Sequence, residues 1–354
     1  MLIKLNSIII FALVAFFLSW IIYPLYIKLL HKYKLGKTIR EDSATGEKSV
    51  IFSQMHEHKK GTPTMGGGIF LLVVGLMIGA SYVLKHYGFV NNTLVTRQET
   101  YVLLFGFFSM GLIGLVDDIL NIKGHGKVKG LSAKTKLIGM FIFAAFISRR
   151  FYSKLGVDYI NFWPFGGNVS LGILYPIITF FLTISIVNAI NITDGLDGLA
   201  GGLMMIILFV LAVITFFNGT FIATTVIAII MAILIAFMFY NINPAKIFMG
   251  DSGAFALGGL LSALLYMLNM RMGILLPFVV LFGIFIIDTG SSFLQILSKK
   301  YRKKKLFAVS PLHHLFEHRG TPETTIVMKA WLIQGILAAI VIIAIFYQFN
   351  GKIL

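Results

Sequence analysis

Long apolar runs recur along the whole chain, and they constrain its fold more than any other feature. Ten of them are long enough, or nearly long enough, to cross a bilayer as helices, which takes about 20 apolar residues. The runs are continuous and lack the alternating pattern of membrane barrel strands, so we expect their backbone groups to bond within helices. They cover residues 8–27, 69–84, 101–116, 137–147, 171–187, 199–217, 221–240, 254–268, 273–297 and 326–346.

Composition agrees with this reading. The chain has 354 residues, of which 58% are hydrophobic and 12% charged, and its mean hydropathy is +0.89; soluble domains carry about 25% charged residues. We therefore predict an all-α, polytopic membrane helical bundle of about ten transmembrane helices, forming one domain over residues 1–354. Cysteine is absent, which excludes disulfides and thiolate metal ligands.

The distribution of basic residues predicts the orientation in the membrane. Segments 28–66, 121–136, 241–251 and 298–329 hold 22 of the 30 lysines and arginines, so the positive-inside rule places these segments in the cytoplasm. With ten spans, both termini are then extracytoplasmic. The net charge of +16 suits anionic lipid headgroups or phosphorylated substrates. Nucleic acid is not an expected partner, because no separate basic domain is present.

Carboxylates stand at the ends of three apolar runs, in a chain with only 14 acidic residues. They are Asp117 and Asp118, then Asp194 and Asp197, and finally Asp251. Ionisable groups at membrane depth are costly and usually functional. All of them fall on the predicted cytoplasmic side, which indicates a metal-dependent reaction centre at one membrane face.

Each carboxylate also has an ordinary structural explanation. Asp117 and Asp118 diverge by about 100° on a helix, so in a reaction centre they would have different roles. Alternatively, both mark the membrane–water interface at the helix end and pair with Lys123 or Lys127. Asp251 precedes an apolar run, where aspartate is a favoured helix N-cap.

A second polar group lies in the segment NAINITDGLDGLAGG. Asn188, Asn191, Asp194 and Asp197 recur every three residues and would line one side of a helical turn, although a solvated turn between two spans has a similar composition. His313 and His314, in SPLHHLFEHRG, fit either an interfacial loop or a phosphate contact.

Five segments occur in a specific order: HKKGTPTMGG, GLVDDILNI, NAINITDGLDGLAGG, NINPAKIFMGDSGA and SPLHHLFEHRG. Together they resemble the MraY family, the phospho-N-acetylmuramoyl-pentapeptide transferases, within the polyprenyl-phosphate N-acetylhexosamine-1-phosphate transferase superfamily. The resemblance implies a bacterial inner (cytoplasmic) membrane enzyme, active on the cytoplasmic face and homodimeric. It implies transfer of phospho-MurNAc-pentapeptide from UDP-MurNAc-pentapeptide to undecaprenyl phosphate, with Mg²⁺, giving lipid I and UMP in peptidoglycan synthesis.

Carried over position by position, the resemblance also implies a set of site residues. The catalytic set is Asp117, Asp118, Asp251 and His313, with Asp251 as the magnesium ligand. The substrate-binding set is Lys59, Thr64, Asn191, Asp194, Leu196, Asp197, Asn241, Phe248, Gln295 and His314. Within it, Lys59, Leu196, Asp197 and Phe248 match positions around the uracil, and Phe248 is the stacking face.

Three positions depart from the usual pattern of the family. Leu315 replaces the third of three consecutive histidines, Asp288 stands where a glutamate is common, and the loop at 42–58 is long. None of these changes touches the carboxylates.

Two other functions compete with this one. A sister polyprenyl-phosphate GlcNAc-1-phosphate transferase would use UDP-GlcNAc, and the TPTMGG and PLHH segments argue against it. A cation-coupled transporter would carry its carboxylates near the bilayer midplane, whereas here they cluster at one face. The sequence leaves open whether the lipid phosphate attacks directly or a covalent aspartyl-phosphate forms first.

Overall fold

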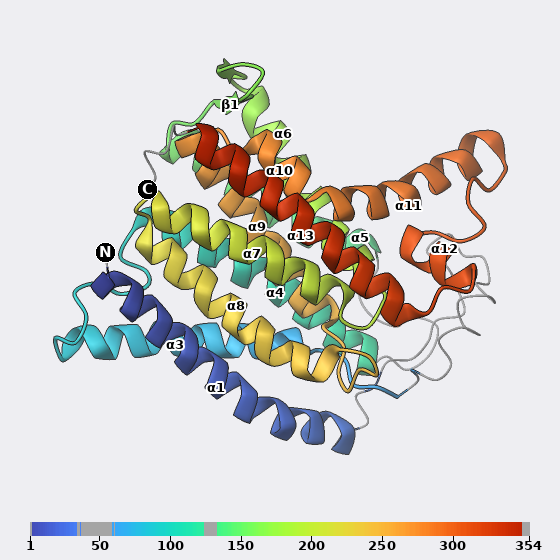
Figure 1. Cartoon of the computed structure of the whole chain (residues 1–354), viewed down its shortest axis with the longest axis horizontal. Coiled ribbons are helices and arrows are strands. Elements are labelled where there is room, and N and C mark those ends of the chain that lie inside the picture. Colours follow the sequence, from blue (N-terminus) through green and yellow to red (C-terminus); the bar gives the residue numbers. More distant parts are fainter. Residues whose placement is uncertain (1, 34–35, 37–58, 60, 124–132, 349–354) are drawn as a thin grey trace.

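The computed structural model describes residues 2–33, 36, 59, 61–123 and 133–348, and in this part the protein is a bundle of helices with one small hairpin (Figure 1). The helices are α1 (Leu2–Lys32), α3 (Gly67–His86), α4 (Gln98–Lys123), α5 (Ala133–Lys154), α6 (Leu174–Thr193), α7 (Leu199–Phe217), α8 (Phe221–Asn241), α9 (Gly250–Met272), α10 (Leu275–Leu281), α11 (Gly283–Arg302), α12 (Leu312–His318) and α13 (Glu323–Gln348). The strands are β1 (Tyr159–Asn161) and β2 (Asn168–Ser170).

Eight of the described helices are long and apolar enough to cross a membrane, and α10 with α11 would add a ninth span despite a bend of 73° between them. The prediction of an all-α membrane bundle is therefore confirmed. The fourth predicted run, 137–147, forms the middle of α5, a helix of 22 residues. It is not among these eight because lysines and arginines lie near both of its ends.

Helix α9 is the centre of the bundle and is buried along nearly its whole length. It packs against α4 through small residues, which let two backbones approach closely. A Cβ added at Gly106 would lie 2.6 Å from the carbonyl oxygen of Gly259, and one added at Gly114 would collide with the carbonyl of Asp251. We call this contact the α4–α9 seam; it places the first turn of α9 beside the last turns of α4.

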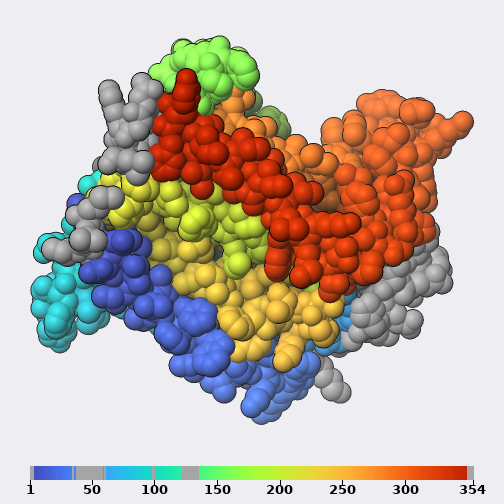
Figure 2. Space-filling view, viewed as in Figure 1, coloured from blue at the N-terminus to red at the C-terminus, as the bar shows by residue number. Residues whose placement is uncertain are grey.

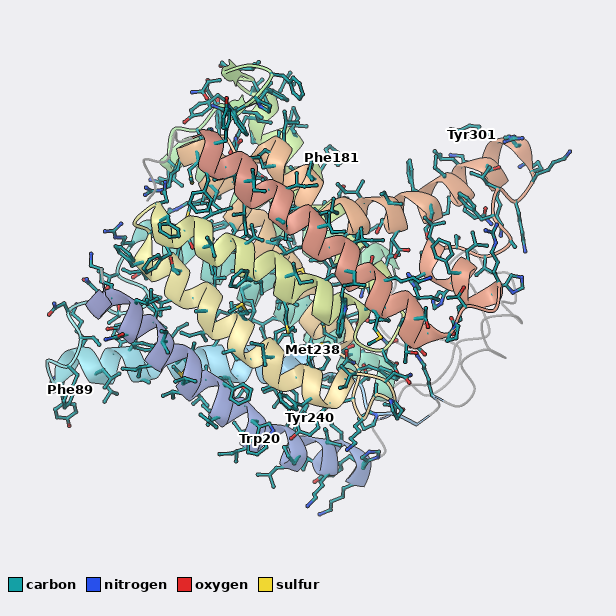
Figure 3. All side chains as sticks on the ribbon, viewed as in Figure 1. Trp20, Phe89, Phe181, Met238, Tyr240 and Tyr301 are labelled. Carbon is teal, nitrogen blue, oxygen red and sulfur yellow. The ribbon has the colours of Figure 1, made fainter. Side chains whose placement is uncertain are left out.

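Outer helices present apolar side chains to the surroundings. On α1, Ile21 and Leu25 are 60% and 63% exposed, and on α13, Leu332 is 70% exposed, as expected for surfaces that face hydrocarbon. Helix α1 packs along α8, and Figure 3 labels Trp20 and Tyr240 at this contact, where the Tyr240 hydroxyl donates a hydrogen bond to the Trp20 carbonyl at 3.4 Å. The N- and C-terminal ends of the described chain lie on the same side of the molecule (Figure 1).

The hairpin and helix α11 lie at the periphery. Strands β1 and β2 are antiparallel, with Ile160 opposite Val169, and the Tyr159 hydroxyl bonds to the carbonyl of Met270, near the end of α9. The hairpin therefore lies at the opposite end of α9 from Asp251. Helix α11 projects away from the body of the bundle (Figures 1 and 2), and its last turn carries Lys299, Lys300 and Arg302.

Candidate active site

Two of the predicted carboxylates meet at the ends of α4 and α9. Lys136 of α5 lies between them, with its Nζ atom 2.6 Å from Oδ2 of Asp117 and 2.6 Å from Oδ2 of Asp251. The amide nitrogen of Asn121 donates to Asp117 at 2.6 Å, and that of Asn191, on α6, donates to Asp251 at 2.8 Å. Four helices, α4, α5, α6 and α9, thus converge on one polar cluster, and the structure brings Asp117, Asn191 and Asp251 together there, as the resemblance implies.

Asp118 does different work from its neighbour. Its two carboxylate oxygens accept hydrogen bonds from the backbone N–H groups of Asp251, at 3.1 Å, and Ser252, at 3.0 Å. A carboxylate at a helix N-terminus is favoured by the unpaired N–H groups and by the helix dipole. Asp118 therefore caps α9 from another helix and leaves the Asp251 side chain free of that capping role.

The other partners considered for these carboxylates are Lys123 and Lys127. They lie outside the residues whose side chains the structure describes. The partner that the structure does place beside Asp117 is Lys136.

Sequence reasoning missed Lys136, because a lysine before an apolar run is typical of an interfacial anchor. Burial lowers the pKa of its ammonium group, but the carboxylates of Asp251 and Asp117 more than offset this and hold the pKa above its ordinary value. Lys136 is therefore a cation at neutral pH.

A second polar cluster joins segments that are far apart in the sequence. Nζ of Lys59 lies 2.8 Å from Oδ1 of Asp197 and 2.5 Å from Oε1 of Glu323, the first residue of α13. The other oxygen of Asp197 accepts from the Asn243 side chain and from the Ala245 backbone, both at 3.0 Å. The structure brings Lys59 and Asp197 together as the resemblance implies, and it adds Glu323, which the sequence analysis did not identify.

The loop between α6 and α7 connects this second cluster to the histidines. Gly198, at φ 78°, ends the loop in a conformation that glycine adopts readily. A Cβ on Gly195 would collide with the imidazole of His313, and it would lie 3.0 Å from Nε2 of His314. The loop therefore passes directly against the histidine pair of α12, and glycine at position 195 allows that approach.

His313 is held from α11. Its Nδ1 atom lies 2.8 Å from Oδ2 of Asp288, and its backbone N–H donates to Oδ1 at 3.2 Å. Thr193 also donates to Asp288, at 3.0 Å. Asp288, although shorter than the glutamate common at this position, thus binds His313 directly. The remaining ring nitrogen of His313 is buried and has no hydrogen-bond partner among the described residues. His314 pairs with Glu317 at 3.1 Å, while Leu315 is buried.

Other predicted residues shape the surroundings of the clusters. Asn241 accepts from the Gly198 backbone and donates to the Ile247 carbonyl, so it ties the end of α8 to the loop before α7. Phe248 is half-buried, and its backbone bonds to Pro63 and Gly66. Thr64 lies close to Gly250, because a Cβ added there would meet its hydroxyl at 3.0 Å. Leu196 is buried and Asp194 half-buried.

Two residues singled out from the sequence, Gln295 and Asn188, bond to backbone groups of the protein. The side chain of Gln295 bonds to the backbone of Leu306 and Phe307, so it holds the segment that follows α11. Asn188 bonds to the carbonyl of Ile184 in its own helix. The four polar residues at three-residue spacing therefore do not act as one set, because α6 ends at Thr193. The long loop at 42–58 lies outside the described residues.

A largely apolar hollow of about 410 Å³ lies next to the histidine pair. Residues of α11, α12 and α13 line most of it, and among them Ile287 and Ile333 are 62% and 52% exposed. Asp288 and His313 are its polar residues nearest the site, and Lys329 adds a cation. The hollow thus joins the polar site to the outer, apolar surface of the bundle.

The Asp117–Asp251 pair is the part of the structure best suited to a divalent cation. Within the described segments, no group of three or more histidine, aspartate or glutamate side chains forms a metal cluster. Mg²⁺, however, is commonly held by one or two carboxylates together with substrate phosphates. Two carboxylates that already share one cation, Lys136, have the charge and the oxygen ligands that this requires.

Comparison with known proteins agrees with the geometry. Residues 100–269 match the family described as "Glycosyl transferase family 4". The chain is 36% identical over 332 residues to the phospho-N-acetylmuramoyl-pentapeptide-transferase of Clostridium novyi, covering 93% of this chain and 94% of the relative. It is 34% identical over 341 residues to that of Staphylococcus epidermidis, covering 93% and 97%. The chain therefore belongs to the phospho-N-acetylmuramoyl-pentapeptide-transferase family.

Proposed function

We propose that this protein transfers phospho-MurNAc-pentapeptide from UDP-MurNAc-pentapeptide to undecaprenyl phosphate, giving lipid I and UMP in peptidoglycan synthesis. The observation that carries the proposal is the convergence of Asp117, Lys136 and Asp251 at the ends of three helices of a membrane bundle. Family membership supports the same reaction. The uridine donor is soluble and the acceptor is a membrane lipid, so a reaction between them needs a polar site at the ends of membrane helices.

The transfer is a displacement at phosphorus. An oxygen of the lipid phosphate forms a bond to the β-phosphorus of the donor, which carries the sugar, and the bond from that phosphorus to the bridging oxygen breaks to release UMP. Because both reactants are anions, catalysis is mostly positioning and charge neutralisation. Asp117 orients or deprotonates the lipid phosphate. Lys136 and Asn121 hold the Asp117 carboxylate in position.

Magnesium is part of the proposal, with Asp251 as its ligand. The bound ion would neutralise the negative charge of the donor's diphosphate and of the lipid phosphate that approaches it. Asn191 orients the Asp251 carboxylate, and Asp118 holds the first turn of α9 in place.

The hollow beside His313 supports a lipid acceptor. An isoprenoid chain needs an apolar path from the bilayer to the polar site, and the hollow is lined mainly by apolar residues of α11, α12 and α13. Ile287 and Ile333 are exposed at the outer surface of the bundle. His313 lies where the phosphate end of such a chain would approach the loop between α6 and α7.

Location and assembly complete the proposal. The protein belongs in the inner (cytoplasmic) membrane of a bacterium with its site on the cytoplasmic face, because uridine nucleotides are made in the cytoplasm and 22 of 30 basic residues lie in the segments on that side. The homodimer that the resemblance implies stays a prediction.

The decisive experiment compares two donors. Purified protein is incubated with undecaprenyl phosphate and Mg²⁺, and with either UDP-MurNAc-pentapeptide or UDP-GlcNAc; released UMP and the lipid product are measured by chromatography and mass spectrometry. We expect lipid I from the first donor only, loss of product with a chelator, and at least about a hundredfold lower turnover in Asp251→Asn. Product from UDP-GlcNAc alone would assign the sister reaction instead, and full activity of Asp251→Asn would remove the metal assignment.

A further inference from the structure

Glu323 occupies a central position in the second polar cluster. One oxygen of its carboxylate, Oε1, accepts from the Lys59 ammonium at 2.5 Å and from the backbone N–H of Asp197 at 2.6 Å. Its other oxygen, Oε2, is 3.5 Å from the side-chain nitrogen of Asn243. A single side chain at the start of α13 thus contacts three separate segments of the chain.

The charge balance of this cluster depends on Glu323. Lys59 is 8% exposed and is the one buried lysine or arginine in the part of the chain that the structure describes. Removing one partner of a buried ion pair is costly because it leaves a charge without compensation. Both oxygens of Asp197 already accept hydrogen bonds, one from Lys59 and the other from Asn243 and Ala245. Glu323 supplies the second counter-charge and the only acceptor that the structure gives to the Asp197 N–H.

The same loop is fixed at two points. Gly195 abuts the imidazoles of His313 and His314 in α12, and two residues later Asp197 is bonded to Glu323 at the start of α13. Residues 319–322 are all that separate α12 from α13. A shift of the start of α13 would therefore move both the loop and the surroundings of Lys59.

The chemistry of the cluster matches a nucleotide. An ammonium, a carboxylate and a side-chain amide come together at Lys59, Asp197 and Asn243. Phe248, which is half-buried, lies in the same loop between α8 and α9 as Asn243. Aromatic rings stack on bases, and polar groups of this kind pair with base edges. We propose that Glu323 is a positioning residue for the nucleotide part of the donor, through Lys59 and the loop from Asp194 to Gly198; this rests on the proposed function.

The first test separates donor binding from chemistry. In Glu323→Gln, the neutral amide keeps the shape of the side chain but removes its charge. We expect KM for UDP-MurNAc-pentapeptide to rise at least about fivefold while kcat stays within about twofold, which is the signature of lost binding that ground and transition states share. KM for undecaprenyl phosphate stays unchanged, and Glu323→Asp, which keeps the charge, recovers part of the loss.

Asp158→Asn is the matched control, because it removes one carboxylate charge at the hairpin, where Asp158 accepts from Ser170. Its kinetic constants should equal those of the wild type. A Glu323→Gln variant with unchanged KM for the donor, or with lower kcat at unchanged KM, would overturn the positioning role. If the wild type transfers nothing from UDP-MurNAc-pentapeptide, the proposed function fails instead, and the two failures are distinguishable.

A double-mutant cycle tests whether Glu323 acts through Lys59. We expect Glu323→Gln to weaken UDP binding, measured by calorimetry, in the wild-type background and to have a clearly smaller effect in a Lys59→Gln background, where its bonds to the Asp197 N–H and the Asn243 side chain remain, since residues in one network are not additive. Equal effects in both backgrounds would show that Glu323 acts independently of Lys59 and would overturn the proposal. Thermal unfolding of all variants in the same detergent identifies any that lose binding only because they unfold.

Discussion

At the scale of single residues, one ammonium group connects the two carboxylates of the proposed reaction. Lys136 lies 2.6 Å from both Asp117 and Asp251. Without it, the buried carboxylate of Asp117 and the partly exposed carboxylate of Asp251 would face each other, and like charges at short range disfavour the ionised forms. Lys136 therefore offsets the repulsion between the two groups and holds them close together, which a site for phosphoryl transfer needs.

We predict that Lys136→Met lowers kcat by about a hundredfold, comparable with the loss of one preorganised charged group from an active site. The measurement is UMP release at saturating concentrations of both substrates. Lys154→Met is the matched control, because Lys154 is exposed at the other end of the same helix, and it should leave kcat unchanged. Turnover of Lys136→Met within about twofold of the wild type would show that the lysine is only an interfacial anchor.

Sequence reasoning found Asp117 and Asp251 but missed two charged residues that bond to the predicted site residues, Lys136 and Glu323. Asp117 and Asp251 stand out because a carboxylate at the end of an apolar run is unusual. Lys136 and Glu323 do not, because a charged residue flanking a span is the normal pattern there. Only the packing of α5 and α13 against distant segments distinguishes these two from ordinary flanking charges.

At the scale of the elements, the α4–α9 seam sets the distance between the carboxylates. Hydropathy predicts α7 and α8 closely, because Gly198 and Thr220 stand just before their apolar runs. Hydropathy does not separate α10 from α11 and predicts one span for both. A count of apolar residues gives the length of a segment but not its direction, and no proline marks the break at Phe282. The seam is equally hidden from hydropathy, because it depends on which glycines face each other across two helices.

Gly114→Ala tests the seam. The added methyl group would collide with the backbone of Asp251, so α9 must shift, and overpacking of this kind costs about 1–3 kcal/mol. We expect a lower thermal unfolding temperature and a loss of turnover, both measured on detergent-purified protein. Gly75→Ala is the control, since a Cβ there meets nothing within 4 Å, and it should leave both properties unchanged or raise the stability slightly. Wild-type turnover in Gly114→Ala would mean that the carboxylate spacing does not depend on this contact.

At the scale of the whole molecule, the site and the two chain ends lie on different sides of the bundle. The described chain begins and ends on one side (Figure 1), while the carboxylate cluster is at the start of α9, away from the hairpin that marks the other end of that helix. The bias of basic residues predicts that the side of the site faces the cytoplasm.

Cysteine labelling tests that assignment, because the chain has no cysteine of its own. Phe89 and Tyr301 are 76% and 73% exposed, and Figure 3 labels them at opposite ends of the molecule. A membrane-impermeant thiol reagent added to intact cells should label Phe89→Cys and not Tyr301→Cys, and permeabilised cells should label both. The reverse result would place the carboxylates outside, where no uridine nucleotide donor is made.

The departure of α11 from the bundle couples the site to the membrane itself. Along its length Ile287, Phe293 and Ile296 are exposed, so we expect lipid to cover this face of the helix and the basic residues at its end to lie at the headgroups. A helix anchored in this way changes its tilt when the hydrocarbon layer becomes thicker or thinner. Because Asp288 of α11 holds His313, we expect a change in the tilt of α11 to displace one wall of the site, so that turnover depends on bilayer thickness.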